Sequence, residues 1–200
     1  MNEDLRVELE HMRRRDERTR SRLMESGELF EGYSEEMERL HLENAARLEE
    51  ILDDSGWPTR SEVGEAGVES AWLVAQHAIS RPDLQRRCLS ELIEAVAEEE
   101  APAWQVAYLA DRIRVNEGRP QIYGTQLDWN AEGELAPQPI EAPAEVDRRR
   151  AEVGLVPLAE AVELARRHAR VEGHLPPADR EGSRERREEW ARRVGWIGPE

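Results

Sequence analysis

The stretch Gly-Val-Glu-Ser-Ala-Trp-Leu-Val-Ala-Gln-His-Ala-Ile, residues 67–79, decides the fold that we expect for this chain. Its side chains are apolar on nearly every side of a helix, and a helix without a polar face is typical of the buried centre of a bundle. Gln76 and His77 are the polar exceptions near its end. We therefore expect a central helix that other helices surround.

Amphipathic patterns before and after this stretch predict the helices that pack around it. Apolar residues recur there at steps of three and four, which is the spacing of one helix face. Glycine and proline mark the ends, with breaks expected at Gly27 and Gly32, Ser34 as an N-cap, and residues 59–66 as a glycine-containing connector. The predicted helices span residues 3–26, 34–54, 82–99, 102–116, 143–153 and 157–171, and residues 180–193 form either a solvated helix or a disordered tail.

One β-hairpin interrupts this pattern. Residues 121–127 and 135–140 flank a turn-like segment at 130–133, and the prolines of the second run favour an edge strand. The predicted fold class is therefore all-α, mainly a helical bundle with one small β-hairpin. We expect a helical domain over residues 1–156 with the hairpin near 121–140, followed by a C-terminal helix and a charged, partly solvated tail over 157–200.

Composition excludes several classes of function. The chain has 200 residues, 28 basic and 44 acidic, for a net charge of −16, and every basic residue is arginine. A chain without lysine has no Schiff-base or P-loop amine, and an acidic chain repels nucleic acid. No run reaches the ~18 apolar residues of a membrane span, the single Cys88 excludes an intrachain disulfide, and the acidic start is no signal peptide. We expect a cytoplasmic protein with neither nucleic-acid nor membrane partners.

Polar residues interrupt the apolar stripes of several predicted helices. Burying such groups costs several kcal/mol unless they are paired, so we expect them to meet in one polar interior. The alternative is a structural network that fixes the packing of the helices, or surface ion pairs within one helix. The residues are Asp16 and Arg20, Asn44, Gln76 and His77, and Asp111 and Arg112.

The predicted first strand of the hairpin adds a second group of polar side chains. Alternation in a strand puts Gln121, Tyr123 and Thr125 on one face. Gly124 leaves room for a ligand or another backbone to approach, and Gln126 adds a further amide. These residues either orient a polar substrate or belong to an ordinary exposed strand.

Five sequence blocks occur in a characteristic order. They read WP at 57–58, VG at 63–64, AWLVAQHA at 71–78, YLADR at 108–112 and QIYGTQ at 121–126. With these blocks, the chain over about residues 10–155 resembles a family of uncharacterised bacterial domains that share WP, VG, AWLxxQHA, YLxDR and QxYGTQ. The family's upstream D-x-x-x-R and Asn fall on Asp16, Arg20 and Asn44. The resemblance implies that these residues belong together, and it implies no reaction.

The favoured function is a cofactor-independent acid–base enzyme acting on a small polar metabolite in a polar pocket between helices, of lyase, cyclase or hydrolase type. His77 and Asp111 are the candidate catalytic residues, because a carboxylate beside a buried imidazole tunes it for proton transfer. Neither a cofactor nor a metal site is predicted, although an oxygen-rich site on His77, Asp16 and Asp111 is a less favoured alternative. The candidate substrate-binding residues are Asp16, Arg20, Asn44, Gln76, Arg112, Gln121, Tyr123 and Gln126.

Two other functions stay open. A compact helical domain of charge −16 could neutralise a basic partner, as an immunity-type protein would. A non-catalytic sensor could bind a small molecule in the same pocket. An enzyme or a sensor requires Asp16, Asn44, His77, Asp111 and Gln121 to converge around a cavity, whereas an interaction protein expects them scattered or fully paired.

Overall fold

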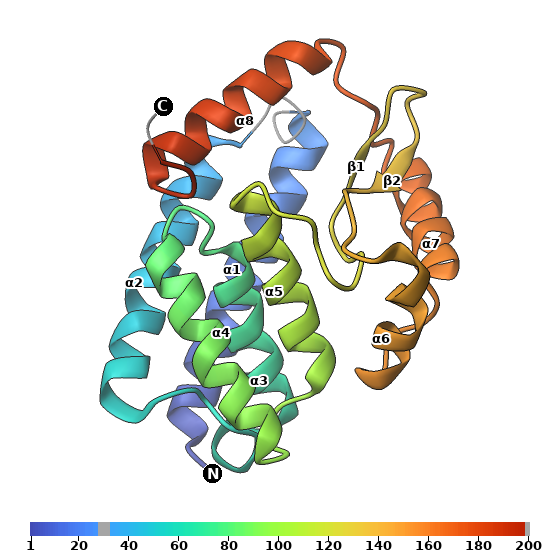
Figure 1. Cartoon of the computed structure of the whole chain (residues 1–200). Coiled ribbons are helices and arrows are strands. Elements are labelled where there is room, and N and C mark those ends of the chain that lie inside the picture. Colours follow the sequence, from blue (N-terminus) through green and yellow to red (C-terminus); the bar gives the residue numbers. More distant parts are fainter. Residues whose placement is uncertain (28–32, 199–200) are drawn as a thin grey trace. The chain divides into compact units, whose positions relative to one another are not determined.

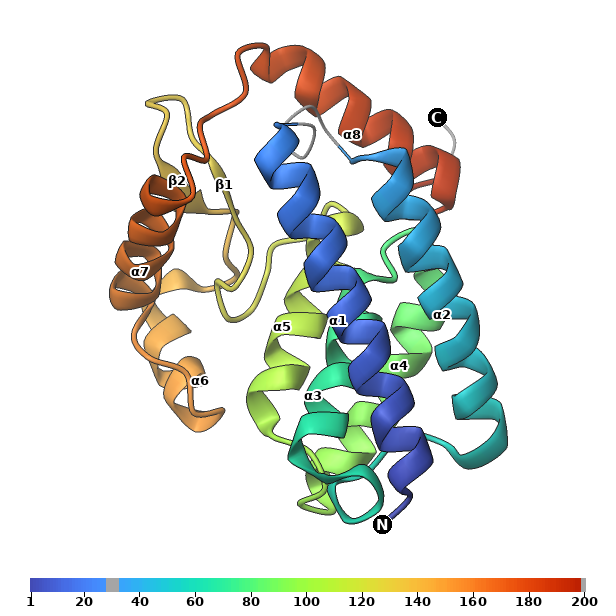
Figure 2. The same ribbon diagram turned by 180° about the vertical axis from the view of Figure 1, so that it is seen from behind.

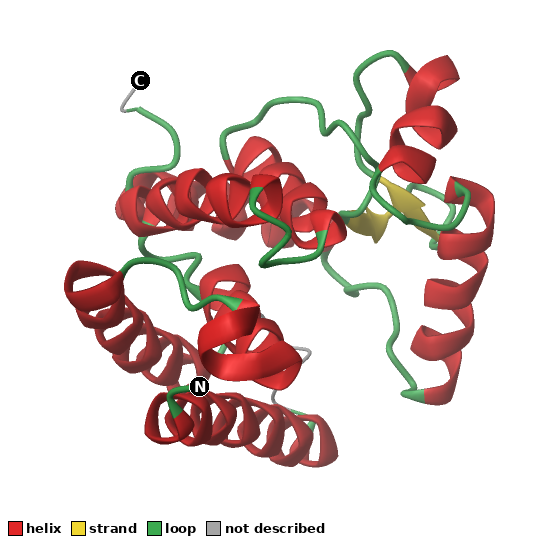
Figure 3. Cartoon of the chain, turned by 90° about the horizontal axis from the view of Figure 1, so that it is seen from below, coloured by secondary structure: helices red, strands yellow, loops and turns green. Residues whose placement is uncertain are grey.

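The chain is mainly helical in the computed structural model, which describes residues 1–27 and 33–198 (Figure 1). Within these residues the strands are confined to one short hairpin (Figure 3). This confirms the predicted all-α class with one small β-hairpin. The elements are α1 (Glu3–Ser26), α2 (Glu35–Ser55), α3 (Arg60–His77), α4 (Pro82–Ala97), α5 (Ala103–Asn116), β1 (Leu127–Trp129), β2 (Leu135–Pro137), the 3-10 turn η2 (Pro143–Glu145), α6 (Val146–Glu152), α7 (Leu158–Val171) and α8 (Arg180–Val194).

The residues pack into two compact units, Met1–Val106 and Ala107–Glu200, which are called here the first and second unit. The division falls inside α5, whereas the sequence predicted a boundary at residue 156. The first unit carries α1 to α4, and the second unit carries the hairpin and α6 to α8.

Helix α3 is the centre of the first unit, as residues 67–79 predicted. It packs against α1, α2 and α4 (Figures 1 and 2). Ala71 and Ala75 are fully buried and Val68 and Val74 nearly so, and these small side chains let neighbouring helices approach closely. Burial of such apolar surface supplies the main free energy that holds the helices together.

The start of α3 differs from the sequence prediction. Residues 59–66 are not a connector, because the helix already begins at Arg60 and buries Val63 completely. Gly64 interrupts the helical backbone directly after Val63, with φ 70° and ψ 175°. This backbone conformation strongly favours glycine, so the glycine signal marks a kink within the helix rather than a loop before it.

The ends of the first two helices follow local capping chemistry. The Asn2 side chain accepts a hydrogen bond from the Leu5 amide at 3.2 Å and caps α1. Gly27 ends that helix in the left-handed conformation. Ser34 occupies the predicted N-cap position of α2, but its side chain makes no capping hydrogen bond. The predicted break at Gly32 lies outside the described residues.

The second unit is built around the hairpin and α7. Strands β1 and β2 pair antiparallel, with Trp129 opposite Leu135, and α7 packs against β2 and α6. Residues 180–194 are helical, so the first of the two options predicted for this segment is confirmed. None of the described helices combines the length and the apolarity that a membrane span needs.

Candidate functional site

The polar residues predicted to share one interior divide between the two units. Asp16, Asn44, Gln76 and His77 lie in the first unit on α1, α2 and α3, and Asp16 and His77 are in contact. Arg20 is on α1 one turn after Asp16 and is exposed. The remaining predicted residues belong to the second unit, so the convergence of the two sets stays a prediction. They are Asp111, Arg112, Gln121, Tyr123 and Gln126.

Three side chains of the first unit meet at a single carboxylate oxygen. The Oδ2 atom of Asp16 lies 2.8 Å from Nδ1 of His77 and 2.8 Å from Nε2 of His41. The two imidazole rings face each other with centroids 4.8 Å apart. Asp16, His41 and His77 therefore form one cluster, called here the histidine–aspartate cluster, supplied by three different helices.

The two ring nitrogens of His41 have different surroundings. Its Nδ1 lies 2.7 Å from the hydroxyl of Tyr33, and the two rings stack with centroids 5.8 Å apart. Its Nε2 is buried and close to Asp16, yet it is not aligned to make a hydrogen bond with any described residue. The contact between His77 and Asp16, by contrast, is a hydrogen bond.

The electrostatics of the cluster favour a charged carboxylate. Asp16 is only 3% exposed, and burial by itself raises the pKa of a carboxyl group. The hydrogen bond with His77 and the close approach of His41 outweigh that burial and hold the pKa of Asp16 well below its usual range. The cluster is thus a buried anion with two imidazoles around it at neutral pH.

Helix periodicity positions two members of the cluster. Asp16 belongs to the buried face of α1 together with Leu5, Leu9 and Met12. His41 follows Met37 by four residues on the buried face of α2, a spacing that places both on one side of a helix. His41 was not among the predicted site residues because charged residues surround it in the chain, although its spacing to the apolar stripe marks it as buried.

The helices α2 and α3 each carry a buried amide close in sequence to their histidine of the cluster. Asn44 is 3% exposed and one turn after His41 on α2, and Gln76 is 2% exposed and precedes His77 on α3. The side-chain nitrogen of Asn44 and both side-chain polar atoms of Gln76 have no hydrogen-bond partner among the described residues. Buried amides of this kind are costly, and they are the candidate substrate-orienting groups of the first unit.

Asp111 organises a loop in the second unit. Its carboxylate accepts hydrogen bonds from the amides of Ile122, Tyr123 and Thr125 at 2.6 to 3.1 Å and from the Thr125 hydroxyl at 3.0 Å. The prediction of a strand over 121–127 is therefore wrong for residues 122–126, where the amides of Ile122, Tyr123 and Thr125 bind a carboxylate of α5. Gln121 forms an isolated bridge with Ile140, and residues 127–129 pair with β2.

The glutamines that were predicted to bind substrate make hydrogen bonds within the same loop. The side chain of Gln121 donates to the carbonyls of Gln126 and Gln138 at 2.9 and 2.8 Å and accepts from the Gln126 amide at 2.9 Å. The pKa of Tyr123 is raised, because the ring is partly buried and lies near the Asp111 charge. Gln121 thus acts on the loop backbone, and the substrate-binding role predicted for these residues stays a prediction.

Two arginines that the sequence analysis did not single out complete the loop. Arg150 is 1% exposed and donates to the carbonyls of Tyr123 and Val156 at 2.6 Å each. Arg149 donates to the Ile122 carbonyl at 2.9 Å. Both arginines lie on α6, far along the chain from the loop, so no local sequence pattern announces these contacts.

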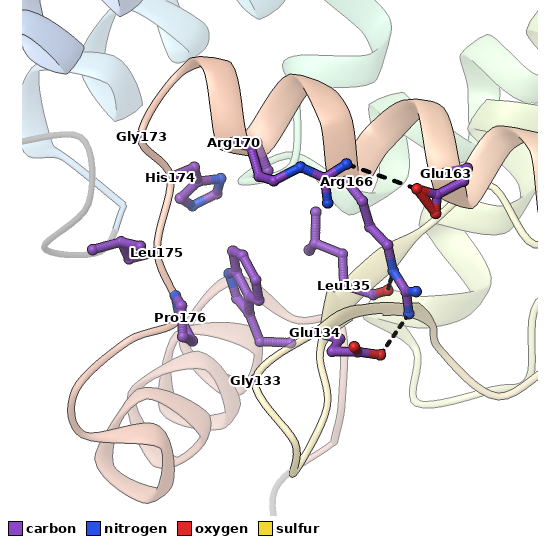
Figure 4. Close-up of a pocket in the computed structure, with 12 residues that line it drawn as sticks. Gly133, Glu134, Leu135, Glu163, Arg166, Arg170, Gly173, His174, Leu175 and Pro176 are labelled. Atoms are coloured by element: carbon purple, nitrogen blue, oxygen red, sulfur yellow. Dashed lines mark hydrogen bonds and ion pairs between the residues drawn. The ribbon is translucent and has the colours of Figure 1, made fainter.

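A separate hollow of about 400 Å³ lies within the second unit (Figure 4). Hairpin residues and α7 form its walls, including Trp129, Leu135 and Arg170. Arg166 in its wall is already engaged, since it donates to the Leu135 carbonyl at 2.9 Å and pairs with Glu134 at 3.0 Å. None of the residues singled out from the sequence lines this hollow, so it is not the predicted site.

The histidine–aspartate cluster is also the place where a metal ion could bind. Each of its three residues offers one ligand atom, and these atoms lie within 4.8 Å of one another. Asp111, which the sequence analysis had set beside Asp16 and His77 as an alternative ligand, is not in this group. No organic cofactor is suggested by the geometry of the described residues.

Comparisons with known proteins give a family and no activity. Neither a curated protein nor a solved structure matches the chain. A family model described as "Family of unknown function (DUF6624)" matches residues 3–170. This confirms the expectation of an uncharacterised domain family, and the chain belongs to this family of unknown function.

Proposed function

We propose that the chain is an enzyme that catalyses acid–base chemistry on a small polar metabolite at the histidine–aspartate cluster. The observation that carries the proposal is the approach of two imidazoles, at 2.8 Å each, to one oxygen of the buried Asp16 carboxylate. Titratable groups that face each other in a buried setting mark functional sites. The reaction class is that of a lyase, a cyclase or a hydrolase.

The reacting proton is exchanged on the His77 side of the cluster. The His77 side chain is 26% exposed, whereas those of His41 and Asp16 are 9% and 4% exposed. A substrate or a water molecule therefore reaches the cluster at His77. The carboxylate of Asp16 orients the His77 ring through the hydrogen bond to Nδ1, as second partners of catalytic histidines do.

Asp16 replaces Asp111 as the carboxylate of the proposed site. The oxygens of Asp111 already accept hydrogen bonds from three loop amides and a hydroxyl. This carboxylate therefore stabilises the loop. Asn44 and Gln76 are the proposed substrate-orienting amides, because they are buried with polar atoms unpartnered among the described residues. Arg20 is the proposed partner for an anionic group of the substrate.

Covalent catalysis by the single cysteine does not fit this proposal. Cys88 is fully buried, and burial raises the pKa of its thiol to about 12. The thiolate is the nucleophilic form of cysteine, so Cys88 is inert at neutral pH. Proton transfer or water-mediated chemistry remains, in a protein that we place in the cytoplasm without a nucleic-acid partner.

Activity-based metabolite profiling tests the proposal. The purified chain is incubated with a bacterial metabolite extract, and changes are followed by mass spectrometry. Wild type and a His11→Ala control are expected to consume one metabolite and form one product, since His11 is an exposed residue of the same α1 helix. His77→Ala and Asp16→Asn are expected to do neither.

The outcomes separate the proposal from its alternatives. A folded His77→Ala variant that turns over the same metabolite as wild type would contradict an enzyme built on this cluster. A metabolite that wild type binds without change would identify a sensor instead. A chain that ignores the extract but binds one basic protein tightly would support the interaction function that its charge of −16 suggests.

A further inference from the structure

We infer that Asp16, His41 and His77 are the ligands of one divalent transition-metal ion of the zinc type. The inference rests on the site of the proposed function and names the group that works there. It departs from the sequence prediction, in which no metal site was assigned. Four observations on this cluster support it.

The first observation is the distances between the ligand atoms. In a tetrahedral site with metal–ligand bonds of ~2.0–2.1 Å, neighbouring ligand atoms stand about 3.4 Å apart. Here Asp16 Oδ2 lies 2.8 Å from each of the two histidine nitrogens, and all three atoms lie within 4.8 Å of one another. Shifts of about half an ångström, which side-chain rotation supplies, would admit the ion.

The second observation is the orientation of His41. Its Nε2 atom is buried and directed at the cluster, but it makes no aligned hydrogen bond with any described residue. A buried nitrogen left this way costs free energy. A metal ion between His41 and Asp16 would use the lone pair of this nitrogen and would explain why the two atoms approach without forming a hydrogen bond.

The third observation is the support behind His41. Metal-binding histidines almost always engage a partner with their other ring nitrogen, which fixes the tautomer and the ring orientation. The Tyr33 hydroxyl lies 2.7 Å from Nδ1 of His41 and fills this place. With Nδ1 occupied by Tyr33, Nε2 is the nitrogen left for the ion.

The fourth observation is the balance of charge and access. A buried carboxylate needs a compensating positive charge, and Asp16 is 3% exposed with two imidazole nitrogens 2.8 Å from one of its oxygens. A divalent cation would supply that charge. The partial exposure of His77 leaves one side of the site open, and catalytic zinc sites keep such a position for water.

The ligand set points to the class of ion. Two imidazoles and one carboxylate suit zinc, cobalt, iron or manganese, whereas Mg²⁺ and Ca²⁺ prefer oxygen ligands only. A water molecule on such an ion loses a proton near neutral pH. That proton would pass to solvent, and the hydroxide would then accept a proton from the substrate and so become the bound water again.

The experiment measures metal binding without any substrate. The chain is stripped with a chelator, and Zn²⁺ is titrated by calorimetry into wild type and four variants, with Mg²⁺ as a second probe. Wild type and His11→Ala are expected to bind one Zn²⁺ per chain and not to bind Mg²⁺ there. Asp16→Ala and His77→Ala should weaken Zn²⁺ binding at least about 100-fold, and Tyr33→Phe about 10-fold to 100-fold.

Tyr33→Phe keeps the test decisive if the ligand variants fold poorly, since it removes only the hydroxyl behind His41. Wild type that binds no Zn²⁺, or Zn²⁺ binding that Asp16→Ala and His77→Ala leave unchanged, would overturn the inference. If His77-dependent turnover persists in the stripped protein, the inferred metal site is refuted and the proposed enzymatic function is retained. If Zn²⁺ binds at the cluster but no metabolite is converted, the inferred metal site is supported and the proposed enzymatic function is refuted.

Discussion

Replacing Asp111 by asparagine tests whether this residue holds the 121–126 loop or takes part in chemistry. The substitution keeps the shape of the side chain and exchanges one acceptor oxygen for an NH2 group that donates. Oδ1 accepts from the Ile122 amide at 2.6 Å, and Oδ2 accepts from the Thr125 amide at 3.0 Å. Whichever oxygen is lost, at least one loop amide faces a donor.

The cost follows from these contacts. A buried donor left without an acceptor costs about 1–3 kcal/mol, and each hydrogen bond that remains loses about 1 kcal/mol when its acceptor is no longer charged. The expected loss in the free energy of unfolding is therefore about 2–4 kcal/mol. Glu132→Gln is the matched control, because Glu132 is an exposed acidic residue of the same unit, and its change should stay within about 0.5 kcal/mol.

Urea unfolding measures the loss, and hydrogen exchange locates it. The amides of Ile122, Tyr123 and Thr125 should exchange faster in Asp111→Asn than in wild type, while amides of the central helix α3 keep their rates. A variant as stable as the Glu132→Gln control, with unchanged exchange at these three amides, would refute the reasoning. Asp111 would then be available for the catalytic role that the sequence suggested.

Two further predictions concern the first unit. Cys88, whose thiol pKa is raised to about 12 by burial, should not react with a disulfide reagent in the native protein and should react fully in urea. Rapid native labelling would contradict that burial. Gly64→Ala should cost about 1–3 kcal/mol of unfolding free energy through backbone strain alone, because φ is +70° and no atom lies near the added methyl group. An unchanged urea midpoint would show that the kink relaxes.

Local patterns predicted the helices well because their apolar faces and end signals lie within the same segment. The first helix was expected over residues 3–26 and spans Glu3–Ser26. The C-terminal charge-dense helix likewise begins at Arg180, as expected. Gly64 shows the limit of such signals, since a glycine can mark either a loop or a kink and only packing of Val63 into the core decides between them.

Contacts between distant segments account for what the sequence could not predict. The loop at 121–126 alternates like a strand, but a carboxylate from α5 and two arginines from α6 capture its polar groups. His41 has charged neighbours in the sequence, and only its spacing from Met37 places it on the buried face of α2. The sequence placed Asp16 and His77 in one interior, and the structure adds His41 as a third member that contacts the same Asp16 oxygen.

A crystal structure grown with Zn²⁺, with anomalous scattering recorded at the zinc edge, tests the central claim most directly. The account predicts one strong peak about 2.0–2.3 Å from Asp16 Oδ2, His41 Nε2 and His77 Nδ1, with a water molecule at the open position. Zinc found only on exposed carboxylates, with the 2.8 Å hydrogen bond between His77 and Asp16 still in place, would contradict it.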